Sequence, residues 1–238
     1  MITCVADALH PQVGVAAARL LRRHGVRLRF PGAQTCCAQP AYNAGYHEEA
    51  RDVAARFIDA FDGDDPIISV SGSCAAMARS VYPSLFEPGD PRRGLALRFA
   101  ERVVEFSEFF VERLGLEDIG ARFEGRAVYH TSCHMRRLLG VVDAPRRLLC
   151  AVQGLELVEA GDDTECCGFG GAFAVKMPEL STAMADSKID PLQEAGVEFL
   201  VSSDMACLMH MSGRAQRRGL GLRALHIAEL LAEGVGLA

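Results

Sequence analysis

Eight of the nine cysteines occur in two copies of one pattern, and this duplication constrains the fold more than any other feature of the sequence. In each copy a single cysteine is followed by an adjacent pair and then by another single cysteine. The first set is Cys4, Cys36, Cys37 and Cys74, and the second set is Cys133, Cys166, Cys167 and Cys207. Corresponding members are 129, 130, 130 and 133 residues apart. Because the register is kept so closely, the pattern indicates an internal repeat and predicts two halves that fold alike.

The residues between the cysteines predict strands that alternate with helices. Strand-like apolar runs cover residues 2–4, 26–30 and 67–70 in the first half and 127–133, 155–159 and 198–202 in the second. Helical patterns cover residues 13–24, 47–61, 145–152, 177–187 and 205–218, and a last strand begins at 222 and leads into a helix closing at 231. This alternation predicts an α/β fold of two pseudo-repeated, Rossmann-like parallel-sheet halves, each with one Cys-Cys pair.

The segment between the halves breaks the repeat. We expect a first repeat at residues 1–86, a connector at 87–125 and a second repeat at 126–238. A turn at 88–91 opens the connector, and a helix is expected over 95–114. Apolar residues recur there at helical spacing, namely Leu95, Phe99, Val103, Phe106 and Phe110.

The cysteines are expected to gather into two metal sites. Each cysteine-bearing segment lies at or after a predicted strand, and ligands collect outside the carboxyl ends of parallel strands. Four thiolates are the usual ligands of an iron–sulfur cluster, although soft thiolates also bind zinc. Two other interpretations remain open, which are thiol redox chemistry without a metal and cysteines that are buried as small apolar residues. The loop 166–171 adds three glycines, which allow the backbone to approach a ligand closely.

One cysteine, the seven histidines and two basic residues complete the set of residues with a possible link to the sites. Cys150 stands outside both sets and is expected to be a core residue. Four histidines lie near the cysteine loops, and two of them, His134 and His210, are candidates to touch a cluster; the four are His10, His130, His134 and His210. His24, His47 and His226 are expected at the surface or at helix caps. Lys176 and Arg214 are candidates to balance the charge of a cluster.

Composition and charge exclude several classes of protein. The net charge of −6 argues against nucleic-acid binding, which needs a basic surface. No apolar run reaches the roughly 18 residues of a membrane span, and no signal peptide is recognised, so a cytoplasmic location is expected. Paired cysteines in a reducing compartment are more often ligands or catalysts than disulfides. No glycine-rich fingerprint follows the first predicted strand, so no NAD or flavin site is expected.

The segments around the cysteines resemble the cysteine-rich CCG-domain family, with one CCG motif per half. The resemblance is strongest to the lactate utilization protein A family of (Fe-S)-binding proteins, and it extends to glycolate oxidase iron–sulfur subunits and to the heterodisulfide reductase subunit that carries such motifs. The residues that carry it are 35–46, 71–77, 129–134, 165–171 and 203–210. Two departures stand out. Ala38 replaces the usual glycine after the first pair, and Ser71 and Asp204 stand where heterodisulfide reductase has an additional cysteine, although their oxygens could substitute as ligands.

The resemblance implies an iron–sulfur electron-transfer subunit of an L-lactate, or related 2-hydroxy-acid, oxidation complex. The implied cofactor is a [4Fe–4S] cluster, one or two per chain, with zinc as a possible substitute. Such a chain would depend on other subunits of the redox complex and would be catalytically incomplete alone. The alternatives are a thiol or heterodisulfide-type reductase subunit and a zinc-stabilised structural scaffold of a redox complex.

Overall fold

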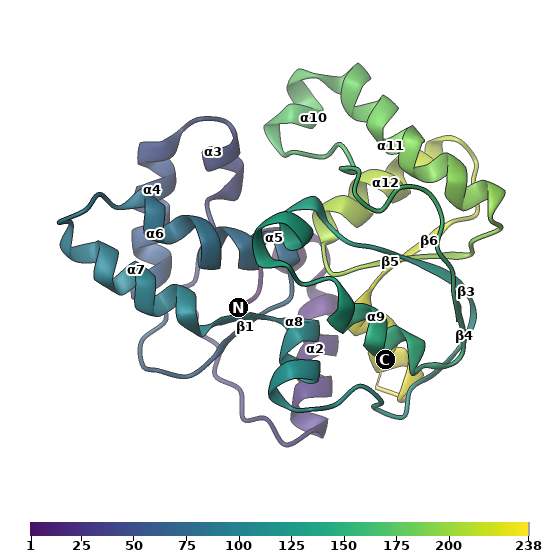
Figure 1. Cartoon of the computed structure of the whole chain (residues 1–238), viewed down its shortest axis with the longest axis horizontal. Helices are drawn as coiled ribbons and strands as arrows, with labels where there is room; N and C mark the ends of the chain where they lie inside the picture. Colours follow the sequence, from purple (N-terminus) through teal and green to yellow (C-terminus); the bar gives the residue numbers. More distant parts are fainter. Residues whose placement is uncertain (238) are drawn as a thin grey trace.

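The computed structural model describes residues 1–237 and contains two parallel sheets, one in each half (Figure 1). The first sheet pairs β1 (Ile67–Ser69) with β2 (Val103–Glu105). The second has the order β4-β3-β5-β6, from β3 (Arg122–His130), β4 (Gln153–Leu157), β5 (Phe199–Ser202) and β6 (Arg223–His226). The predicted α/β fold with two parallel-sheet halves is therefore confirmed.

Helices surround each sheet. The first half and the connector contain α1 (Cys4–Leu9), α2 (Pro11–Arg23), α3 (Gln39–Asn43), α4 (His47–Asp59), α5 (Gly72–Ala76), the π-helical turn η1 (Met77–Val81), α6 (Tyr82–Leu85), α7 (Pro91–Arg102), α8 (Phe106–Glu108) and η2 (Phe109–Arg113). The second half contains η3 (Met135–Leu139), α9 (Asp143–Cys150), α10 (Ala172–Lys176), α11 (Pro178–Glu194), α12 (Met205–Arg217) and α13 (Ile227–Gly234). In Figure 1, α4, α6 and α7 lie with β1 on one side, the larger sheet with α10, α11 and α12 lies on the other, and α5 lies between them.

Several helices form where the apolar spacing predicts them, among them α2, α4, α11 and α12. In α2, the buried residues Val13, Ala17 and Leu20 recur every three or four positions, and Pro11 occupies the first turn, where its missing N–H costs no hydrogen bond. The observed bounds of α4 and α12 differ from the predicted ones by one or two residues at their carboxyl ends. α11 runs to Glu194, seven residues beyond the prediction, and continues past Pro191.

The predicted connector helix over 95–114 is wrong as a single element. It is interrupted by β2, where Val103 and Val104 are buried and Glu105 then caps a new helix. Glu105 and Glu108 form a capping box, in which each side chain accepts a hydrogen bond from the other residue's backbone. The second half has the same arrangement, because β6 ends at His226, which forms a capping box with Glu229 of α13. The pair β1–β2 thus resembles the pair β5–β6, although β2 lies in the segment expected as the connector.

The strands expected at 2–4 and 26–30 are also wrong. α1 already begins at Cys4, and the amino group of Met1 donates to the carbonyl oxygen of Ile68 at 2.7 Å, beside β1. Residues 26–30 follow an irregular path along a cavity of about 820 Å³, which β1 borders with Ile67 and Ile68. The first half therefore keeps only the two strands that correspond to β5 and β6.

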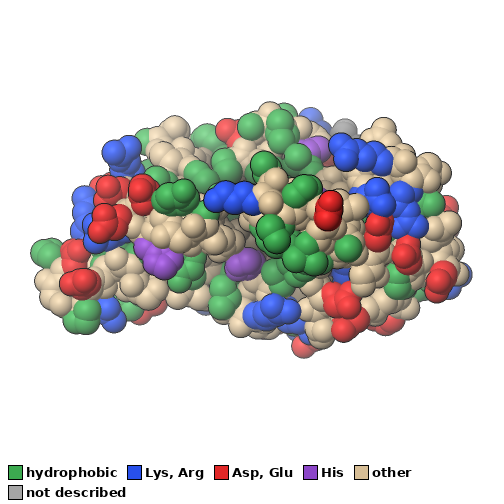
Figure 2. Space-filling view, turned by 90° about the horizontal axis from the view of Figure 1, so that it is seen from above, with side chains coloured by type: hydrophobic (Ala, Val, Ile, Leu, Met, Phe, Trp, Pro, Cys, Tyr) green, Lys and Arg blue, Asp and Glu red, His purple; other side chains and the backbone are tan. Residues whose placement is uncertain are grey.

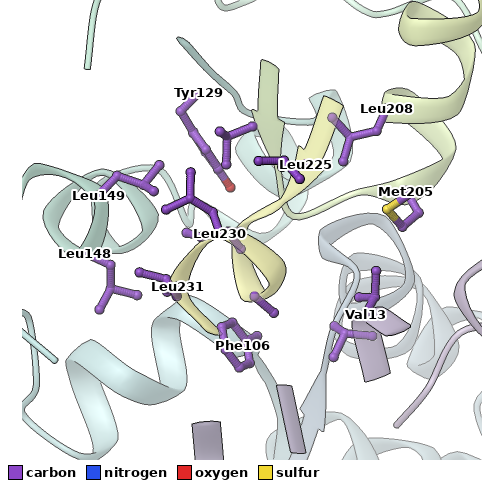
Figure 3. Close-up of a cluster of buried hydrophobic side chains, with 14 of the residues drawn as sticks. Val13, Phe106, Tyr129, Leu148, Leu149, Met205, Leu208, Leu225, Leu230 and Leu231 are labelled. Atoms are coloured by element: carbon purple, nitrogen blue, oxygen red, sulfur yellow. The ribbon is translucent and has the colours of Figure 1, made fainter. Parts of the chain in front are cut away.

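A continuous hydrophobic core joins the two halves. α2 packs against α13, and Leu20 and Leu230 are both fully buried in this contact region. Figure 3 shows Phe106 from the connector and Val13 from α2 facing the same cluster as Leu231. A second cluster fills the space around Phe57, Tyr82 and Phe99, whose rings lie 5.8–6.1 Å apart. The larger core thus holds the sheet ends of both halves in one fixed relation.

α5 and η3 approach each other closely at Gly72. A Cβ atom at this position would lie 2.7 Å from the Sδ of Met135 and 2.8 Å from its Cβ, and Met135 is fully buried. We expect Gly72→Ala to lower the free energy of unfolding by about 1–3 kcal/mol, because a methyl group is forced into a packed contact. Urea denaturation measures this loss.

Gly213→Ala is the matched control, because Gly213 lies inside α12 and its Cβ would meet no atom within 4 Å. It should leave stability unchanged or raise it by up to about 1 kcal/mol through better helix propensity. Equal stability changes in the two variants would contradict a close contact between α5 and η3.

Candidate metal centre

The four cysteines of the first set converge from three segments. Cys4 begins α1, the pair Cys36-Cys37 precedes α3, and Cys74 lies in α5. The Sγ atoms of Cys4 and Cys36 are 3.5 Å apart, and those of Cys37 and Cys74 are 3.2 Å apart. The adjacent thiols of Cys36 and Cys37 also interact, so all four sulfurs form one group.

The second set converges in the same way. Cys133 lies just before η3, the pair Cys166-Cys167 precedes α10, and Cys207 lies in α12. The Sγ atoms of Cys133 and Cys166 are 3.8 Å apart, and those of Cys167 and Cys207 are 3.0 Å apart. The structure therefore gathers the sulfurs of both sets as the spacing predicts. Their role as metal ligands remains a prediction.

Hydrogen bonds among the thiols concentrate negative charge on one sulfur of each set. Cys36 accepts from the thiols of Cys37 and Cys4, which lowers its pKa to about 3. Cys166 accepts from Cys133, from Cys167 and from the N–H of Gly168, which lowers its pKa to about 2. The thiols that donate these bonds have raised pKa values. A metal ion that bound here would have to displace the remaining thiol protons.

The residue after each Cys-Cys pair has a left-handed backbone. Gly168 has φ 88°, and a Cβ on it would lie 2.6 Å from the carbonyl oxygen of Ser181. Ala38, its counterpart, has φ 68°. Replacing the usual glycine by alanine therefore preserves the turn, at a conformational cost of roughly 1–2 kcal/mol for a non-glycine residue in this region.

Polar contacts hold both Cys-Cys loops in place. The hydroxyl of Tyr82 donates to the carbonyl oxygen of Cys37 at 3.1 Å, and the amide of Gln39 donates to that of Ser73 at 3.0 Å. In the second half, Asp163 accepts from the N–H of Thr131 at 3.2 Å and forms ion pairs with Arg136 and Arg146. These contacts tie each loop to the end of a neighbouring strand or helix.

Asp204 links the two sets. Its Oδ2 accepts from the N–H of Ser73 at 2.8 Å and its Oδ1 from the Ser73 hydroxyl at 3.0 Å. The hydroxyl of Ser71 lies 3.4 Å from Oδ1 and accepts from the N–H of Cys74. Burial raises the pKa of Asp204, and the bonds from Ser73 oppose that rise. Ser71 and Asp204 stand where heterodisulfide reductase has an additional cysteine. Their side-chain oxygens therefore form hydrogen bonds that join the two halves.

One cavity of about 100 Å³ borders both sets, and seven of their eight cysteines line it. Pro40 and Phe169 add apolar walls, and Asn43 and His134 add polar groups. Figure 1 shows α3 and α10 rising on either side above α5. Figure 2 looks onto this face, where hydrophobic side chains gather near the middle and charged ones lie mostly around them. The thiols therefore line a partly enclosed, largely apolar hollow.

The donor set fits a metal group. The nine cysteines, all within residues 1–237, are free thiols, so the eight sulfurs of the two sets remain available. Separations of 3.0–3.8 Å are close to those around a single tetrahedral ion, for which Zn–S bonds of about 2.3 Å place ligand atoms about 3.8 Å apart. A multi-iron cluster would require the sulfurs to move apart, and the cavity beside them offers space for this movement.

Among the histidines, His130 is the one that the sequence analysis underrated. A ligand atom of His130 lies within 4.8 Å of the sulfurs of Cys167 and Cys207. Of the two candidates, His134 also reaches the second set, since its Nδ1 lies 3.4 Å from the Cys133 sulfur, whereas His210 Nε2 lies 3.1 Å from the Ser181 hydroxyl. The one signal in the sequence for a role of His130 at the second set is its position three residues before Cys133.

Several other assignments need correction. Cys150 is exposed, because the buried face of α9 is formed by Ala144, Leu148 and Leu149 and the next residue turns outward. His226 is fully buried, although it is a helix cap as expected.

A buried cation near the second set is Lys188, which is neither of the two candidates. Its buried amine donates to the carbonyl oxygen of Asp162 at 2.6 Å, and its charge favours the Cys207 thiolate. Lys176 is exposed, and Arg214 pairs with Asp186 at 2.7 Å.

No helix within residues 1–237 combines the length and the apolar character needed to cross a membrane.

Comparison with known proteins also divides the chain into two cysteine-rich regions, one in each half. The model of the cysteine-rich domain family CCG matches residues 1–79 and 127–212. The chain is similar to a protein named lactate utilization protein A from Geobacillus kaustophilus, with 48% identity over 97% of this chain and 96% of the relative. It is also similar to the protein of that name from Anoxybacillus flavithermus, with 46% identity over 97% and 96%. Lactate utilization protein A 2 from Bacillus cereus is 42% identical over 98% and 97%.

Single substitutions should remove metal from one set at a time. We expect Cys37→Ser and Cys167→Ser each to lower the bound metal to roughly half of the wild-type amount, because each removes one of four thiolates from one set. Metal analysis of anaerobically reconstituted protein measures this.

Cys150→Ser is the control and should retain the full amount, since Cys150 is exposed and outside both sets. A loss of metal in Cys150→Ser, or full retention in both other variants, would contradict the ligand assignment.

Proposed function

Because this chain belongs to the cysteine-rich CCG-domain family, and within it to the lactate utilization protein A family, we propose that it is an iron–sulfur electron-transfer subunit of a system that oxidises L-lactate. The observation that carries the proposal is the gathering of eight thiols into two sets, and seven of the eight line one shared cavity. The substrate class comes from the names of the relatives, and the redox chemistry comes from the thiols.

The preferred cofactor is a [4Fe–4S] cluster in each set, held by four cysteines. Such a cluster takes up and releases one electron at a time. Thiolates are its usual ligands, and backbone N–H groups directed at its sulfurs tune its potential. The N–H of Gly168, which lies 3.5 Å from the Cys166 sulfur, is placed for this role. The buried amine of Lys188 would offset part of the negative charge of the second site.

The shared cavity supports a relay. The two sets border one hollow, and Asp204 and Ser73 bond the segments that carry Cys207 and Cys74. Two one-electron carriers held at a fixed separation can pass electrons between them. Oxidation of a 2-hydroxy acid to a 2-oxo acid releases two electrons and two protons, so we propose that a partner subunit carries out that chemistry and that a second partner accepts the electrons.

We propose that residues 1–86 and 126–238 are the two repeats and that residues 87–125 connect them, with β2 supplied by the connector. We place the system in the cytoplasm, whose reducing conditions keep unligated thiols from forming disulfides.

One competing function has a specific observation in its favour. Sulfur separations of 3.0–3.8 Å resemble the ligand spacing around one zinc ion, which would make the chain a zinc-stabilised scaffold of the same complex. Zinc has no redox chemistry in proteins, so a zinc scaffold would be colourless and could not relay electrons.

The proposal predicts a growth phenotype. Deleting the gene in a strain without another lactate dehydrogenase should abolish growth on L-lactate and leave growth on other carbon sources intact. Wild-type protein should restore growth, whereas Cys166→Ser should not, because it removes a thiolate from the second site.

Cys150→Ser serves as the control and should restore growth fully. Normal growth of the deletion strain would contradict the lactate assignment. Full rescue by Cys166→Ser would retain the pathway but contradict the second site as an essential relay.

A further inference from the structure

His130 is a buried imidazole without a hydrogen-bond partner on either ring nitrogen. Its exposed fraction is 3%, and neither Nδ1 nor Nε2 has a partner among residues 1–237. Buried side-chain nitrogens are nearly always hydrogen-bonded, so an orphaned pair requires an explanation. An absent ligand is one such explanation, because a neutral imidazole nitrogen is a common metal donor.

The fold fixes the position of this ring. His130 is the last residue of β3, in register with Ser202 of β5, whose hydroxyl donates to the His130 carbonyl oxygen at 2.8 Å. The strand end therefore places the imidazole beside the second set. A ring nitrogen and the sulfurs of Cys167 and Cys207 all lie within 4.8 Å of one another.

A second buried histidine shows what a structural role looks like in this chain. His226 ends β6, one strand over from β5, and is also fully buried. Its Nε2 bonds to the carbonyl oxygen of Val70 at 2.8 Å, and its Nδ1 accepts from the N–H of Ala228 at 3.1 Å. Both nitrogens of His226 are satisfied, whereas neither nitrogen of His130 has a hydrogen-bond partner within residues 1–237.

The first half offers no equivalent donor. His130 lies three residues before Cys133, and the residue three before Cys4 is Met1. The amino group of Met1 is already bonded to Ile68. The duplicated sites are therefore chemically unequal, since a nitrogen donor accompanies the second set alone.

We propose that His130 is a ligand of the metal group held by the second set, which makes that site mixed in nitrogen and sulfur while the first site is held by sulfur alone. The inference rests on the proposed function only in requiring that a metal group binds. Ligand atoms around a single tetrahedral ion lie about 3.5–3.8 Å apart, so these three atoms would need to move by about an ångström to hold one ion. To hold a multi-iron cluster they would move apart into the neighbouring cavity.

This asymmetry sets a direction for electron transfer. When the neutral imidazole takes the place of one of the four thiolates of the second set as a ligand, the metal group is less negative, and histidine in place of cysteine raises the potential of iron–sulfur centres. The buried Lys188 amine acts in the same sense at the second site. One electron then passes from the first site, which is oxidised, to the second site, which is reduced.

The experiment uses the full chain, reconstituted anaerobically with iron and sulfide, with the histidines labelled with ¹⁵N. Pulsed EPR of the reduced protein should detect a directly coordinated imidazole nitrogen in the wild type. His130→Ala should lose this coupling, and His130→Cys should lose it while keeping iron and lowering the potential of the second site. His210→Gln is the matched control, because His210 lies near the same loop but bonds to Ser181, and it should keep the coupling.

A parallel titration of the metal-free protein with Co²⁺ alone separates this inference from the proposed function. The ligand-field bands of the Co²⁺ protein should shift in both His130 variants and remain unchanged in His210→Gln. Bound iron without imidazole coupling, or coupling that persists in both His130 variants, would overturn the role of His130 while leaving the proposed function intact. Failure to take up iron, together with Co²⁺ bands that depend on His130, would overturn the iron–sulfur function and support the ligand.

Discussion

The hydrogen bonds of the Asp204 carboxylate join the two halves at the point where their cysteines meet. Asp204 precedes α12 in the second half, and it accepts from the backbone and side chain of Ser73 in the first. The N–H of Gly72 adds a bond to the carbonyl oxygen of Ser203 at 3.1 Å. Cys74 directly follows Ser73, and Cys207 lies three residues after Asp204, so the same bonds fix the distance between the two sets.

Burying this carboxylate is costly unless it is well bonded. Asp204 is 2% exposed, and burial without hydrogen bonds would cost several kcal/mol. Two strong bonds to Ser73 and a longer contact with Ser71 compensate, and they form only when the halves adopt this relation. The shared core around α2 and α13 supports the same arrangement from the other side of the sheets. The two sets therefore behave as one rigid centre.

Much of this arrangement could be predicted from the duplicated cysteines. Their spacing predicts the convergence of both sets, and apolar periodicity predicts helices such as α2 and α12. The strands at 2–4 and 26–30 could not be excluded from sequence, because an apolar run fits either a strand or the irregular path seen here. β2 was missed because Val103 and Val104 continue the helical spacing of the residues before them, and only their pairing with β1 identifies a strand.

The polar residues of the site were harder to predict. The sequence showed His130 only as one of four histidines near the cysteine loops, and it gave no reason to prefer Lys188. Their importance comes from burial beside Cys207, which only the tertiary structure reveals. Cys150 illustrates the reverse case, since its apolar neighbours suggested burial but its place on α9 directs it outward. Ala38 shows that the backbone of a turn can be preserved when its usual glycine is lost.

Mössbauer spectroscopy of wild-type protein reconstituted anaerobically with ⁵⁷Fe and sulfide tests the central claim, that the two thiol sets hold iron–sulfur clusters, most directly. The account predicts that nearly all of the bound iron shows the parameters of tetrahedral, sulfur-coordinated sites in multi-iron clusters. It also predicts two distinguishable components, because His130 accompanies the second set alone. Iron that remains mononuclear or bound through oxygen, or a protein that takes up zinc and excludes iron, would contradict it.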